Sequence, residues 1–141
     1  MRIDLTITPD QLNDAVQNTI RFFDNYRFSK KTDQDGRLIV YDSEWSGTYY
    51  YFITEDGSGS QLSVEAKKTE KPLGLKEQSA YEEIFIKNIL KIIDKEIVIT
   101  PEIARRDIYK KNRKAPGPIT IIYILIIVVV IVIGMKSCLK V

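Results

Sequence analysis

A run of 17 residues without a charge, from Ile119 to Met135, constrains the chain more than any other feature of its sequence. Fourteen of these residues are Ile, Leu, Val or Met. An α-helix of this length spans roughly 26 Å at about 1.5 Å per residue, close to the ~30 Å hydrocarbon thickness of a bilayer. Only six residues follow the run, so we expect no later element to cover it as part of a folded core. We therefore predict a single transmembrane helix over residues 119–135.

The charges of the chain are divided unevenly and suggest an orientation for this helix. Residues 1–100 contain 13 Lys and Arg against 17 Asp and Glu, whereas the remaining 41 residues contain 8 against 2. Lys and Arg next to a membrane span resist translocation, so we expect the N-terminal part to be cytoplasmic. The six basic residues before the predicted span are also predicted to lie at the membrane surface, unless they act as a topology signal alone. They are Arg105, Arg106, Lys110, Lys111, Arg113 and Lys114.

These features divide the chain into four parts. We predict a soluble domain at residues 1–100, a basic juxtamembrane linker at 101–118, the transmembrane helix at 119–135 and a short tail at 136–141. Two prolines and a glycine at residues 115–118 oppose a continuous helix between linker and span. The first eight residues alternate polar and apolar side chains, so we expect no cleaved export signal.

The N-terminal domain begins with signals for one strand and one helix. Ile3, Leu5 and Ile7 alternate with polar residues, as in a half-buried strand. Thr8 is then a suitable N-cap, with Pro9 at the first helical position and Gln11 completing a capping box. The helix is predicted to end near residue 24 or 25, with an apolar face of Leu12, Ala15, Val16, Ile20 and Phe23.

Residues 26–67 have apolar side chains at every second position, in four groups separated by turn residues. This pattern predicts four antiparallel strands. Ser79 and Glu82 form a second capping box, which predicts a helix that runs to about Glu96 and covers the sheet. Thr100 and Pro101 have the form of a further helix start. The apolar face expected for the helix after residue 79 is Tyr81, Ile84, Phe85, Ile89, Leu90, Ile92 and Ile93.

The predicted fold class is therefore α+β, with the element order β-α-β-β-β-β-α and one C-terminal transmembrane helix. Over residues 1–97 this order resembles one repeat of the TATA-binding-protein fold and is similar to a shortened helix-grip module. The resemblance implies a sheet that holds a long helix, with the space between them either filled by side chains or open to an apolar ligand.

The residue types of the chain exclude several kinds of chemistry. There is no histidine, and Cys138 is the single cysteine, so imidazole and cysteine-rich metal sites and Ser-His or Cys-His catalysis are excluded. Asp33 and Asp35 resemble the opening of a calcium loop, but the third acidic position and the closing glutamate are missing, which favours a hairpin turn. The domain is net acidic, which disfavours nucleic acid as a partner. We expect a protein that is not an enzyme and that needs no cofactor.

Aromatic residues supply the candidate binding surface. Trp45, Tyr50 and Phe52 are predicted to form an exposed face that binds a partner or an apolar ligand, unless Tyr50 and Phe52 merely line the outer side of the sheet. Two functions remain open. One is a membrane-anchored interaction module or accessory subunit, with the bilayer and a protein as partners. The other is a membrane-tethered binder of a lipid or other apolar ligand, held in a pocket between the sheet and the helix at residues 79–96.

Overall fold

The computed structural model describes residues 1–68 and 70–109, and the described chain has an α+β fold. Five antiparallel strands form one sheet, as the period-two pattern predicted. The predicted order of elements is confirmed up to the second long helix, and the short helix expected from Thr100 and Pro101 follows it. The elements are β1 (Arg2–Leu5), α1 (Pro9–Phe22), β2 (Tyr26–Phe28), β3 (Leu38–Asp42), β4 (Gly47–Asp56), β5 (Gly59–Lys68), α2 (Leu75–Ile93) and α3 (Pro101–Ala104).

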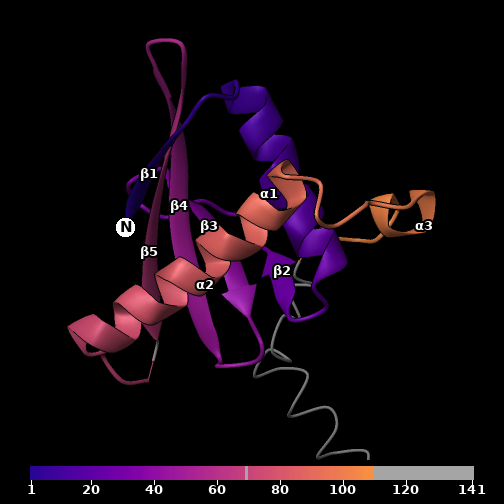
Figure 1. Ribbon diagram of the computed structural model, residues 1–141. Helices are drawn as coiled ribbons and strands as arrows, with labels where there is room; N and C mark the ends of the chain where they lie inside the picture. Colours follow the sequence, from indigo (N-terminus) through magenta and orange to yellow (C-terminus); the bar gives the residue numbers. More distant parts are fainter. Residues whose placement is uncertain (69, 110–141) are drawn as a thin grey trace, which may run out of the picture. The chain divides into compact units, whose positions relative to one another are not determined.

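The order of strands across the sheet is β1-β5-β4-β3-β2 (Figure 1). Strands β2 to β5 follow one another as a meander, and β1 then pairs with β5, with Ile3 opposite Leu62. Helix α1 therefore connects the two edges of the sheet, because β1 lies at one edge and β2 at the other. This pairing between the first and last strands links residues about 60 positions apart.

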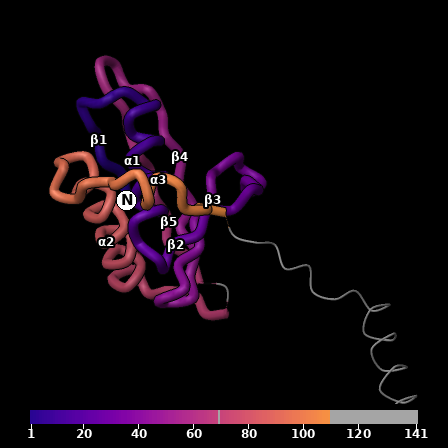
Figure 2. The backbone as a smooth tube through the Cα atoms, turned by 90° about the vertical axis from the view of Figure 1, so that its right-hand side faces the viewer, coloured from indigo at the N-terminus to yellow at the C-terminus, as the bar shows by residue number. Residues whose placement is uncertain are grey.

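Helices α1 and α2 pack on the same face of the sheet (Figure 2). Their buried side chains join those of the strands in a single core that includes Leu12, Val16, Val40, Leu62, Val64 and Ile89. Aromatic rings fill its centre: the rings of Tyr49 and Phe85 stack with centroids 4.4 Å apart, and the ring of Tyr26 meets that of Phe85 edge-on at 5.3 Å. The space between α2 and the sheet is thus occupied by side chains.

The start of α1 confirms the predicted capping box. The Thr8 hydroxyl accepts the Gln11 backbone N–H at 3.3 Å, and the Gln11 side chain accepts the Thr8 N–H at 3.0 Å. The helix ends at Phe22, two residues before the first of the predicted end points. Local hydrogen bonds define this start without help from the rest of the fold, which explains why the sequence pattern sufficed.

The start of α2 differs from the prediction. The helix begins at Leu75 behind Gly74, which offers no side-chain cap, so the predicted capping box of Ser79 and Glu82 is wrong. Ser79 lies one turn inside the helix. The helix also ends at Ile93 rather than near Glu96. Its predicted apolar face is wrong for Ile84, which is 51% exposed, and the buried Ile86 was not anticipated. The other predicted positions are buried or pack against the core, namely Tyr81, Phe85, Ile89, Leu90, Ile92 and Ile93.

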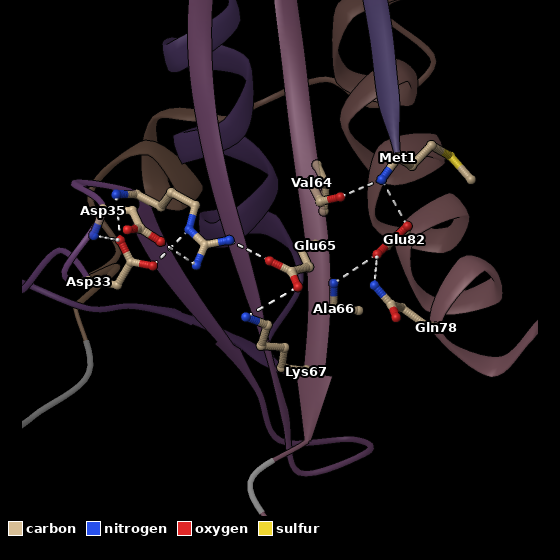
Figure 3. A network of polar contacts seen from close by, with 10 residues as sticks. Met1, Asp33, Asp35, Val64, Glu65, Ala66, Lys67, Gln78 and Glu82 are labelled. Carbon is tan, nitrogen blue, oxygen red and sulfur yellow. Dashed lines mark hydrogen bonds and ion pairs between the residues drawn. The ribbon is translucent and has the colours of Figure 1, made fainter. Parts of the chain in front are cut away.

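Glu82 is buried because it has partners outside its own helix (Figure 3). Its carboxylate accepts a hydrogen bond from the Met1 amino group at 2.9 Å, from the Ala66 N–H at 3.0 Å and from the Gln78 side chain at 2.8 Å. Burial by itself raises the pKa of Glu82, but these hydrogen bonds outweigh it and lower the pKa overall. Glu82 therefore joins α2 to β5 and to the residue before β1.

The segment after α3 packs against the β2 edge of the sheet. The Phe28 N–H donates to the Ile108 carbonyl, and Phe28 and Tyr109 form a parallel bridge. The Ile108 side chain is 5% exposed and belongs to the core. As predicted, Thr100 caps the short helix α3, where its hydroxyl accepts the Ile103 N–H. Residues beyond position 100 thus contribute to the packing of the domain.

No helix among residues 1–68 and 70–109 is both long and apolar enough to cross a membrane. The predicted transmembrane helix at 119–135 and the tail at 136–141 lie outside the described residues.

Candidate functional site

Trp45 lies in the turn between β3 and β4, on the side of the sheet that the helices cover. Its ring stacks on the ring of Tyr81 from α2, with centroids 4.1 Å apart and planes 10° apart. Its indole N–H donates to the Asp42 carboxylate at 2.8 Å. The indole also covers Gly47, where a Cβ atom would come within 1.9 Å of the ring, so only glycine leaves room for it. The structure thus places Trp45 in packing with α2, apart from Tyr50 and Phe52.

Tyr50 and Phe52 lie on the opposite face of the sheet. They alternate along β4 with Tyr49 and Tyr51, both of which are fully buried beneath the helices. Phe52 remains 36% exposed, and Tyr50 is half-buried. The structure therefore brings two of the three predicted aromatic residues together on the sheet face that α1 and α2 leave open. We call this surface the outer face.

A shallow pocket of about 220 Å³ lies on the outer face, across β1, β5 and β4. Tyr50 and Phe52 form its aromatic wall, Ser63 and Glu65 contribute from β5, and Arg2 contributes from β1. Arg2 is exposed and forms no ion pair with any residue that the structure describes. The pocket therefore combines an aromatic surface with one cation that is free to bind a partner.

Two cations lie near the ring of Tyr50. The Arg37 guanidinium and the Lys67 ammonium each lie 5.2 Å from the centre of the ring. Glu65 accepts from the Arg37 guanidinium and pairs with Lys67 at 3.2 Å, so one carboxylate ties both cations to β5. These contacts orient the phenol ring, and they also neutralise the cations that make them.

Arg37 is further held by two carboxylates, Asp33 and Asp35, in the turn that precedes β3; both aspartates are labelled in Figure 3. Its guanidinium binds Asp33 at 2.7 Å and Asp35 at 3.1 Å. Partial desolvation raises the pKa of Asp33, but hydrogen bonds from the Arg37 backbone and side chain outweigh it and lower the pKa. The two aspartates thus bind an arginine within a turn. The sequence favoured a hairpin turn here over a calcium loop. The described residues contain no group of three metal-binding side chains.

Two buried hydroxyl groups have no hydrogen-bond partner among the described residues. The Ser63 hydroxyl lies under the outer face, and the Tyr51 hydroxyl lies in the core beside Phe28. Desolvation raises the pKa of Tyr51 strongly, so this phenol stays neutral. An unpaired buried hydroxyl costs about 1–3 kcal/mol of stability. No sequence pattern reveals that these two hydroxyls lack partners.

A second surface lies at the β2 edge, and it includes residues that the sequence did not single out. A pocket of about 310 Å³ there is lined by Phe28, Lys30, Lys31, Leu38 and Tyr109, together with Ser29 and Thr32. Lys30 and Lys31 precede Tyr109 by almost 80 residues, and only the parallel bridge between Phe28 and Tyr109 brings them together. No local motif could have identified this surface.

The predicted membrane-surface residues begin at this edge. Arg105 is the C-cap of α3 and is exposed. The Arg106 guanidinium pairs with Asp24 at 2.8 Å, so its charge is partly matched within the domain. Lys110, Lys111, Arg113 and Lys114 lie outside the described residues.

The sequence matches no protein-family model and no curated protein, and no solved structure matches the fold. The resemblance to the TATA-binding-protein repeat and the helix-grip module therefore rests on the order of elements alone.

Proposed function

We propose that this chain is a non-catalytic interaction module, anchored by a single transmembrane helix at 119–135, that binds a protein partner on its outer face. The observation that carries the proposal is the open aromatic surface of β4. Tyr50 and Phe52 are exposed to different degrees on a sheet face that neither α1 nor α2 covers. Aromatic residues held in a fixed orientation are typical anchors of protein interfaces, because they bury a large area at little entropic cost.

The charges around the pocket support a partner segment with acidic groups. Arg37 and Lys67 are already paired with carboxylates, but Arg2 has no carboxylate partner among the described residues. A carboxylate of the partner could pair with Arg2 while an apolar side chain covers Phe52. A volume of about 220 Å³ suits one inserted side chain rather than a whole small-molecule ligand.

The packing of the core favours this function over the alternative ligand binder. A ligand held in the manner of a helix-grip module would occupy the space between α2 and the sheet. The stacked rings of Tyr49 and Phe85 and the edge-on ring of Tyr26 occupy this space instead. Binding an apolar ligand there would require these rings to move apart.

A photocrosslinking amino acid at position 52 of the full chain, in its native membrane, tests the outer face directly. The matched control places the same crosslinker at position 84, because Ile84 is exposed on α2, on the other side of the domain. We expect a discrete crosslinked protein from position 52 that is absent from position 84. Identical products from both positions, or no product from position 52, would rule out the outer face as the binding surface.

The anchor and its orientation need a separate test. Deleting residues 119–135 is expected to release the protein from membranes that retain the full chain after alkaline extraction. We also expect the N-terminal domain to be protected from protease in sealed, right-side-out vesicles, because the basic residues before the span favour a cytoplasmic domain. Retention of the deleted chain on membranes would contradict the anchor, and digestion of the domain would reverse the orientation.

A further inference from the structure

We propose that the pocket at the β2 edge binds the phosphate of an anionic lipid headgroup in the membrane to which the chain is anchored. This inference rests on the proposed membrane anchor but not on the outer face. The pocket volume, about 310 Å³, lies at the lower end of the range for small-molecule sites. Its lining combines two lysines, two hydroxyl-bearing residues and an exposed tyrosine ring.

The two lysines are the first observation that favours an anion. Lys30 and Lys31 are both exposed, and neither forms an ion pair within the described part of the chain. By contrast, Arg37, Lys67 and Arg106 each have a carboxylate partner. The cations at the β2 edge are therefore available to an external anion.

The loop that carries the lysines is held in place by hydrogen bonds. The Ser29 N–H donates to the Ile39 carbonyl at 2.8 Å, and the Ser29 hydroxyl accepts the Lys31 N–H at 3.2 Å. On the other side of the pocket, the Lys30 ammonium lies 5.2 Å from the centre of the Tyr109 ring. The backbone of the loop and the Lys30 ammonium are thus held before a ligand binds, which reduces the entropy lost on binding.

The place of Tyr109 in the chain indicates the source of the anion. Nine residues, 110–118, separate Tyr109 from the start of the predicted span. Even a fully extended chain covers only about 3.3–3.6 Å per residue, so the ten steps from Tyr109 to Ile119 reach about 36 Å at most. Four of the nine are Lys or Arg. With the proposed span inserted, the linker is thus short enough for the pocket to reach the headgroups, where lipid phosphates are concentrated.

Tyr109 has the chemistry of an interfacial residue. Its side chain is 40% exposed, and its ring meets the ring of Phe28 with centroids 5.7 Å apart. Tyrosine is enriched at the level of lipid headgroups because its ring is apolar and its hydroxyl is polar. The Asp107 carboxylate lies close by but is occupied in part, since it accepts the Tyr109 N–H at 3.0 Å. The edge as a whole fits the surface of a bilayer.

The test uses the full chain in nanodiscs of phosphatidylcholine, with or without phosphatidylglycerol, whose negative charge is its phosphate, and measures hydrogen exchange of the amides at residues 28–32. We expect exchange several-fold slower in the anionic discs. The variant Lys30→Gln/Lys31→Gln should lose this protection, since each lysine near an anionic surface strengthens binding about fivefold. The control variant Lys76→Gln/Lys87→Gln removes two exposed charges from α2 and should keep it.

Each other outcome contradicts a specific part of the proposal. Equal loss of protection in both variants would show a general effect of net charge and no site at the β2 edge. Equal protection in neutral discs when glycerol phosphate is added would identify a site for soluble phosphates instead of lipids. If the chain entered both kinds of disc and the amides at residues 28–32 exchanged at the same rate in both, the lipid site alone would be overturned. Failure to co-elute with either disc would overturn the anchor, and the lipid site with it.

Discussion

Shortening the Ile108 side chain tests whether the segment after α3 stabilises the domain. Ile108 is 5% exposed, and its carbonyl accepts the Phe28 N–H at the β2 edge. Replacing a buried isoleucine by alanine costs about 2–5 kcal/mol, because apolar contacts are lost and a cavity remains. We expect Ile108→Ala to lower the free energy of unfolding by about 3 kcal/mol. Val98→Ala is the matched control, since Val98 is 74% exposed and should change stability by less than about 0.5 kcal/mol.

Removing the whole segment should have a larger effect. A fragment of residues 1–100 loses the Ile108 contacts, the hydrogen bond from Phe28 and the surface ion pair between Arg106 and Asp24. The ion pair is exposed and contributes little, so the expected loss relative to a fragment of residues 1–109 is about 3–5 kcal/mol. Domains of this size unfold with about 5–15 kcal/mol, so the shorter fragment should be marginally stable.

Urea denaturation followed by circular dichroism measures this difference. With a slope of about 1–3 kcal/mol per molar urea, the midpoint of the 1–100 fragment should lie about 2 M below that of the 1–109 fragment. Ile108→Ala in the longer fragment should account for most of the shift. If the two fragments unfolded at the same midpoint, the packing of Ile108 would contribute nothing and the domain would end before it.

Further predictions concern the buried polar groups. Tyr51→Phe removes a hydroxyl that has no partner and should raise the free energy of unfolding by up to about 1 kcal/mol. Tyr26→Phe leaves the Asn88 amide unpaired and should lower the free energy of unfolding by about 1 kcal/mol. Chemical denaturation of both variants measures these changes. If Tyr51→Phe were less stable than the wild type, the Tyr51 hydroxyl would have to form a stabilising hydrogen bond. Glu82→Gln should cost about 2 kcal/mol at pH 7, because charge-assisted bonds are lost. Since the folded-state pKa of Glu82 is lowered, its contribution is complete above the ordinary value of 4.5 and is lost as the pH falls below it. A difference between wild type and variant that persisted at pH 2 would contradict this. For the outer face, Phe52→Ala should weaken binding of the partner identified by crosslinking at least fivefold in a titration, and Ile84→Ala should leave its affinity unchanged.

Local signals explain the elements that the sequence predicted well. The capping box at Thr8 and the alternation along β4 involve residues within a few positions of one another, so their meaning does not depend on the rest of the chain. The alternation also placed Tyr50 and Phe52 together on one face of β4, as the structure shows. The candidate binding surface was therefore predictable in part before the fold was known.

Residues with distant partners explain the errors. Ser79 and Glu82 have the spacing of a capping box, but the Glu82 carboxylate is bound by Met1 and by the Ala66 N–H, which no spacing within α2 indicates. Trp45 was grouped with the exposed aromatics because it lies near them in sequence, yet Tyr81 of α2 covers it. Each of these outcomes depends on a contact between elements far apart in the chain.

Local patterns specify the kinds of element, their order and the alternation of faces, because hydrophobic periodicity and turn chemistry act over a few residues. The sequence also predicted the anchor at 119–135, which depends only on the length and polarity of one segment. Contacts between distant parts of the chain were needed to place β1 beside β5, Ile108 in the core, and Lys30 and Lys31 next to Tyr109. These contacts bring together residues separated by about 60 to 80 positions, and their stability depends on burial and pairing that no local pattern specifies.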